Sequence, residues 1–196
     1  MNLLPVAVIA YVLVGLDQAM FETLEVGGCS PRLVIPLLVY VAMYAPARSA
    51  LWLGLCVGLA TDLLSAMTIR NIGLSEPIGV RLIGPNAVGY LVGMYAVIVL
   101  RGYMIKRSPG TPPALTLVAA SLAGIAAVAI VSFRYQLHTT FRLIDPASWE
   151  WRSGTELLLR LGAALYTAIV AIPLSLLFRP LTRTMGLDDT PHRRRN

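Results

Sequence analysis

Long apolar stretches alternate with short polar ones along the chain, and six of these stretches are candidate helices. They cover residues 3–21, 33–45, 49–66, 82–100, 114–133 and 156–178. A helix needs about 20 mostly apolar residues to cross a bilayer core, and several of the stretches meet this requirement. Pro36 predicts a bend near the start of the short second stretch, and Pro173 predicts a kink in the sixth. The pattern predicts an all-α integral membrane protein: one domain, residues 1–196, with a six-transmembrane-helix bundle and a basic tail over 179–196.

Composition supports this class. Hydrophobic residues make up 57% of the 196 residues and charged residues 13%, about half the charged fraction of a soluble domain. The mean hydropathy is +0.71. Cys29 and Cys56 do not suggest a disulfide framework, and we expect both to be free. The first apolar stretch lacks a basic leader and is longer than a signal core, so no cleavable signal peptide is expected.

The loop charges predict an orientation. With six spans, both termini lie on one side of the membrane. That side collects nine basic residues against two acidic ones, whereas the other side carries six of each. The strongest signals are the loop from Arg101 to Arg107 and the arginines at 193–195. Because basic residues stay on the cytoplasmic side, both termini are predicted to be cytoplasmic, in a multi-pass inner-membrane protein.

The third and fourth stretches each carry a stripe of small residues. Gly54, Gly58 and Asp62 follow at i, i+4 and i+8, so they share one helix face. In a bilayer, small residues let another helix approach closely, and an acid there is a candidate for function or partner contact. These stripes either pack the two hairpin helices against each other or receive a helix of another protein. The candidate partner-binding residues are Gly54, Gly58, Asp62, Asn86, Gly89 and Gly93.

Three charged residues fall inside the predicted spans at similar depth. Asp17, Asp62 and Arg160 all lie in the outer half of the membrane, so an intramembrane polar cluster of the three is geometrically feasible. One interpretation is that they pair with each other and lock the bundle. A second is that Asp62 hydrogen-bonds a partner helix or loop, and a third is proton or solute coupling.

No pattern in the chain predicts an enzyme, a cofactor or a metal site. His138 and His192 stand apart from any cluster with metal-ligand spacing. No nucleophile with its base, phosphate-binding loop or catalytic carboxylate pair is evident. The basic loop and tail fit topology signals or contact with anionic membrane lipids, and no nucleic-acid partner is expected.

One part of the chain resembles a known family. The stretch Ser30–Ile35 precedes the short second helix, and Gly58–Leu63 then reads Gly-Leu-x-x-Asp-Leu. A glycine-containing stretch from Ile83 to Gly93 opens the next helix, and the basic loop 101–107 follows. This order resembles the rod shape-determining protein MreD family, most specifically over residues 30–107. The segment 66–82 is longer than is usual in that family, so this sequence departs from the pattern there.

The resemblance implies a non-enzymatic scaffold subunit of the bacterial cell-wall elongation machinery. Such a protein docks an MreC-like single-span partner and helps regulate peptidoglycan synthesis and cell shape. It acts alongside RodA with a class B penicillin-binding protein, directly or indirectly, and reaches MreB through the complex. The resemblance implies that the glycine stripes and Asp62 form the docking site.

The alternative is a small-solute (vitamin-like) binding subunit of a membrane transporter. The MreD family is similar in fold to the six-helix substrate-binding subunits of energy-coupling-factor transporters. That function needs an outward cavity lined by polar and aromatic residues. We expect few polar residues inside the bundle, which counts against it.

Overall fold

The computed structural model describes residues 3–20, 23–64, 67–69, 78–80, 83–103, 110–140, 153–181 and 185–186. These residues form six α-helices and one short antiparallel hairpin. In chain order the elements are α1 (Leu3–Ala19), α2 (Val34–Tyr44), α3 (Ala47–Leu64), β1 (Met67–Ile69), β2 (Ile78–Val80), α4 (Pro85–Leu100), α5 (Thr111–Thr140) and α6 (Ser153–Leu181). Met67 pairs with Val80 in the hairpin. The predicted helical class is confirmed, with this hairpin added in a segment expected to be a loop.

Three of the helices, α3, α5 and α6, are long and apolar enough to cross a membrane. The other three are apolar but shorter. This distribution is consistent with a membrane protein.

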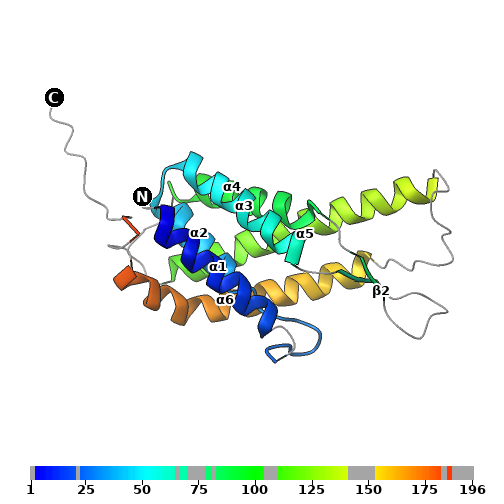
Figure 1. The fold of residues 1–196 in the computed structure, drawn as a ribbon, viewed down its shortest axis with the longest axis horizontal. Helices are drawn as coiled ribbons and strands as arrows, with labels where there is room; N and C mark the ends of the chain where they lie inside the picture. Colours follow the sequence, from blue (N-terminus) through cyan, green and yellow to red (C-terminus); the bar gives the residue numbers. More distant parts are fainter. Residues whose placement is uncertain are drawn as a thin grey trace.

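The helices run along the long axis of the molecule (Figure 1). Successive helices run in opposite directions, so α1 begins and α6 ends near the same end, on the left of the view. The helices α2, α4 and α6 begin toward the opposite end. We call that opposite end the cavity end, because a polar cavity lies there between the helices.

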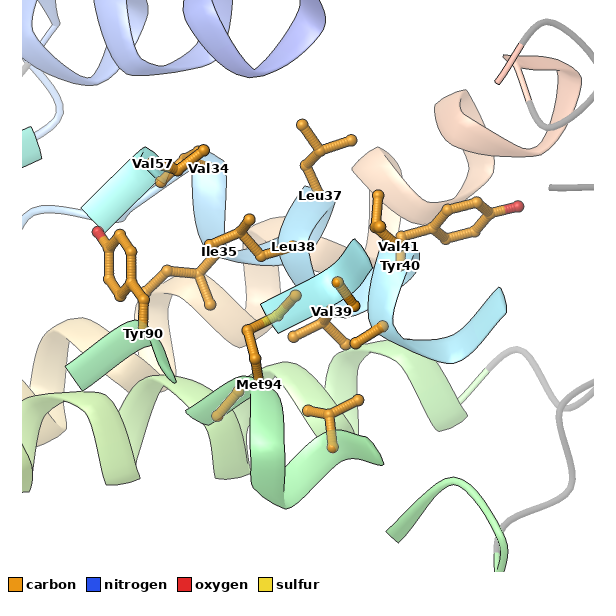
Figure 2. Close-up of a cluster of buried hydrophobic side chains, with 14 of the residues drawn as sticks. Val34, Ile35, Leu37, Leu38, Val39, Tyr40, Val41, Val57, Tyr90 and Met94 are labelled. Carbon is orange, nitrogen blue, oxygen red and sulfur yellow. The ribbon is translucent and has the colours of Figure 1, made fainter. Parts of the chain in front are cut away.

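The short helix α2 lies at the centre of the bundle. All its residues from Val34 to Met43 are buried, and it contacts each of the other five helices. Tyr90 and Met94 of α4 point toward Ile35 and Leu38 of α2 (Figure 2). An apolar surface on every side is typical of a helix enclosed by others. At 1.5 Å per residue, α2 is about 16 Å long, so its sequence suits a core helix better than a lipid-facing one.

Most predicted helix bounds lie within three residues of the observed ones. The exception is α5, which continues to Thr140 beyond the predicted end at Phe133. The polar residues after Phe133 end the apolar pattern, but they do not break a helix. Pro36 lies in the first turn of α2, where a missing N–H removes no helical hydrogen bond. No bend is needed to accommodate it.

Arg101, at the end of α4, fixes the end of α2. Its guanidinium Nη1 donates hydrogen bonds of 2.7 Å to the carbonyl oxygens of both Ala42 and Ala45. The last carbonyls of a helix have no partner within it and carry partial negative charge. A residue predicted as a topology signal therefore also ties α4 to α2.

Candidate functional site

The first glycine stripe is filled by α4. A Cβ added to Gly58 would lie 2.5 Å from the Ala87 Cα and 2.9 Å from its backbone nitrogen. At Gly54 the nearest atom would be Cγ of Met94, at 3.0 Å. Only glycine at position 58 permits this approach of α3 to α4, so the predicted packing of the two hairpin helices is confirmed for this stripe.

The second stripe faces α5 instead of α3. A Cβ added to Gly89 would lie 2.7 Å from the carbonyl oxygen of Ala123, and one added to Gly93 would lie 2.7 Å from that of Ala119. For this stripe, the interpretation that the two hairpin helices pack against each other does not hold, because α4 presents one face to α3 and another to α5. Both stripes are occupied by helices of this chain.

Asp62 holds the start of α4. Its side chain is 2% exposed and accepts hydrogen bonds from the backbone N–H groups of Gly84 (2.9 Å), Asn86 (3.1 Å) and Ala87 (3.1 Å). The first N–H groups of a helix have no partner inside it, and they attract negative charge. Gly84 occupies the N-cap position with φ of 118° and has no side chain to serve as a cap. The Asp62 carboxylate, 22 positions before Gly84 in the chain, serves as the cap of α4 instead.

Asp17 does the same for α2. Its carboxylate accepts hydrogen bonds from the backbone N–H groups of Leu33 (2.6 Å) and Val34 (3.2 Å). Leu33 is the N-cap residue and makes no side-chain cap. Asp17 and Asp62 therefore have the same role, since each connects its own helix to the start of the next.

Arg160 does not form the predicted contact with these acids. Its Nε pairs with Oε1 of Glu156 at 3.0 Å, one turn earlier in α6. The interpretation that the three residues pair with each other is therefore wrong, because backbone N–H groups bind both aspartates. Asp17, Asp62 and Arg160 nonetheless line one cavity.

This cavity has a volume of about 470 Å³ and lies at the cavity end, where all six helices contribute to its wall. Its apolar lining includes Ile35, Ala120 and Ala123. The expectation of few polar residues inside the bundle is wrong. The polar lining consists of Asp17, Gln18, Glu25, Ser30, Arg32, Thr61, Asp62, Asn86, Tyr90, Glu156, Arg160 and Thr167.

Arg32 is a cavity residue that the sequence reasoning missed, since it was treated as a loop charge. Its Nη1 donates to the Tyr90 hydroxyl at 3.3 Å, and its backbone N–H donates to Oγ1 of Thr167 at 3.0 Å. The pKa of Arg32 is raised above its ordinary value, first by its interaction with the Tyr90 oxygen and then by Asp17 and Asp62, whereas burial opposes the rise. The position of Arg32 in the sequence carries a signal. A cation directly before a helix start is electrostatically unfavourable, so an arginine there indicates a further interaction that stabilises it.

The other candidates are placed as follows. Asn86 lines the cavity and is half-buried. Cys29 and Cys56 are both free, as predicted. Within the described ranges, no three His, Cys, Asp or Glu side chains are grouped as a metal site. His192, the tail arginines and most of the segment 66–82 lie outside the described residues.

Searches of protein-family models, curated proteins and solved structures found no match to this chain. The fold and the cavity define the class directly. The chain is a helical bundle of membrane-protein character with a polar cavity at one end.

Proposed function

We propose that this protein is a non-enzymatic scaffold subunit of the bacterial cell-wall elongation machinery, of the MreD type. One observation supports this most. Gly58–Leu63 and Ile83–Ala87, two of the stretches that resemble the MreD family, meet in space. Gly58 allows the contact and Asp62 bonds the backbone of Gly84, Asn86 and Ala87. Gly58 and Asp62 of the motif are thus the residues on which the contact between α3 and the start of α4 depends.

In this proposal the chain is a multi-pass protein of the inner membrane in which all six helices take part in crossing. Both termini are cytoplasmic and the cavity end faces the periplasm. Support comes from the basic residues concentrated on the side of the termini. The alternating helix directions fit an even number of crossings (Figure 1).

An MreC-like single-span protein is the proposed direct partner. Because the glycine stripes are filled by α4 and α5, we place its docking surface outside them. Asp62, Asn86 and the glycines would then act on docking indirectly, by holding the α3–α4–α5 unit together. RodA with its class B penicillin-binding protein, and MreB, would be reached through this complex.

Co-purification tests the proposal. The tagged protein is co-expressed with the MreC-like protein of the same organism and purified in mild detergent. We expect a stable complex, and we expect depletion of the protein to convert rods into round cells. Recovery of the MreC-like protein no better than that of an unrelated single-span protein, with normal cell shape after depletion, would contradict the proposal.

The cavity favours a second candidate, a small-solute-binding subunit of a transporter. Its volume of about 470 Å³ lies within the range of small-molecule sites. This candidate predicts co-purification with ATPase subunits and thermal stabilisation by at least one compound of a vitamin panel. A flat response across the panel, with no ATPase recovered, would contradict it.

A further inference from the structure

The charged groups of the cavity differ in how fully they are hydrogen-bonded. Asp17 and Asp62 accept two and three backbone hydrogen bonds, respectively. They also face the positive ends of α2 and α4, which offset their charge. Glu156 is paired within α6, and Glu25 is exposed. The carboxylates of Asp17 and Asp62 are therefore already held by backbone donors of this chain.

The two arginines of the cavity are in the opposite state. A guanidinium has five N–H donors in a planar fork. Among the described residues, the guanidinium of Arg32 makes one hydrogen bond, at 3.3 Å, to an uncharged hydroxyl. The guanidinium of Arg160 uses only Nε, and its two terminal nitrogens have no acceptor among the residues that the structure describes. Within the described ranges, most N–H donors of the two guanidinium groups therefore have no acceptor.

The arginines also come from different elements. Arg32 precedes α2 and Arg160 belongs to α6, yet both line the same cavity and their positive charges repel each other. An acceptor between them would relieve this repulsion. The half-buried Asn86 adds further donors, since its side-chain amide makes no hydrogen bond within the described part of the chain. Ile35, Ala120 and Ala123 line the cavity with apolar surface.

We propose that the cavity binds an anionic molecule through a phosphate or carboxylate group held between Arg32 and Arg160. The planar fork of arginine matches these oxyanions in a bidentate manner. The apolar lining accommodates an uncharged part of the same molecule. The oxyanion could come from a soluble solute or from an anionic lipid headgroup, and the experiment separates the two. The inference rests on the cavity alone and holds with or without the MreC-like partner.

Thermal unfolding of the purified protein in neutral detergent is the first measurement. Inorganic phosphate, diphosphate and citrate are the soluble probes. At concentrations about 100-fold above Kd, binding raises Tm by roughly 5–10 °C for a chain of this size. In the second arm, the protein is reconstituted in phosphatidylcholine nanodiscs with and without phosphatidylglycerol. Native mass spectrometry then shows whether the anionic lipid is retained.

Arg32→Gln and Arg160→Gln test the residues. Each should weaken binding by at least about tenfold, because hydrogen bonds to charged groups contribute on that scale. Arg134→Gln is the matched control, since Arg134 is exposed on α5 and does not line the cavity. Arg32→Lys keeps the charge but loses the fork, so it should bind with intermediate affinity. If Arg32→Gln does not fold, Arg160→Gln and Arg32→Lys still decide the question.

The outcomes are distinct. A Tm rise with a soluble probe identifies a solute site, and selective retention of phosphatidylglycerol identifies a headgroup site. The proposal is overturned if neither arm shows binding. It is equally overturned if Arg134→Gln weakens binding as much as the two cavity variants, since the anion would then bind the general surface. Neither result depends on recovery of the MreC-like protein.

Discussion

Asp62 and Gly84 lie 22 positions apart in the chain, yet the Asp62 carboxylate accepts a 2.9 Å hydrogen bond from the Gly84 backbone N–H. Asp17 has the same relationship to Leu33 at the start of α2. In both cases an acid near the end of one helix supplies the N-terminal cap that the next helix lacks. Each of these two carboxylates therefore joins consecutive helices at the cavity end.

Loss of the Asp62 carboxylate should destabilise the joint between α3 and α4. Asp62→Ala would leave three N–H groups without their acceptor, and we expect a loss of about 2–3 kcal/mol in the free energy of unfolding. Asp62→Asn keeps one acceptor oxygen and should lose less. Unfolding in mild detergent measures both, with the exposed Glu25→Ala as the control. Equal stability of Asp62→Ala and Glu25→Ala would show that the cap contributes nothing.

Removal of the Asp17 carboxylate should open the start of α2 locally. The helix α1 contacts mainly α2 and α3, and the Asp17 carboxylate adds hydrogen bonds from α1 to the backbone of Leu33 and Val34. We expect Asp17→Ala to speed amide hydrogen exchange at Leu33 and Val34, because these N–H groups lose their acceptor. Exchange at the start of α4 serves as the internal reference and should change little. Unchanged protection of Leu33 and Val34 would refute the link.

The glycines should differ sharply in their tolerance of a methyl group. Gly58→Ala forces a backbone atom of Ala87 to move, because the new Cβ would lie 2.5 Å from its Cα; we expect a loss of about 1–3 kcal/mol. Gly54→Ala should cost less, because its one tight contact, at 3.0 Å, is with the flexible Met94 side chain. Gly15→Ala meets nothing within 4 Å and should be neutral or slightly stabilising, since alanine favours helix. The three variants are compared by thermal unfolding, and equal effects would contradict the predicted order.

Arg101 should matter for stability beyond its role as a positive charge. Arg101→Gln removes a charged donor from the carbonyls of Ala42 and Ala45, and we expect a loss of about 1.5–3 kcal/mol. Arg48 is exposed, so Arg48→Gln removes the same charge without this contact. Parallel denaturation of the two variants separates the contact from the charge. If both variants unfold at the same point, the link to α2 carries no stability.

The two glycine stripes separate what the sequence predicts from what it cannot predict. The spacing of Gly54 and Gly58 predicts that another helix approaches closely, because glycines on one helix face leave space for it. The spacing does not predict which helix approaches. Gly89 and Gly93 have the same spacing as Gly54 and Gly58, but they contact α5. A small-residue stripe specifies a short distance without specifying the neighbour.

The acids show the same division. Asp17 and Asp62 could be identified as unusual from their apolar surroundings alone. Their partners could not, because backbone N–H groups at a helix start have no signature in residue type. The side chain of opposite charge predicted at a similar depth is that of Arg160, which instead pairs with Glu156 in its own helix.

The sequence by itself determined the helical class, the approximate bounds of most helices and the close approach at the first glycine stripe. These follow from local properties: apolar length, helical spacing and the size of each side chain. The tertiary structure alone decided that α2 is the central helix, that α4 is shared between α3 and α5, and that Arg32 and Arg160 line one cavity. These features depend on contacts between distant segments, and such contacts are fixed only when all the helices pack together.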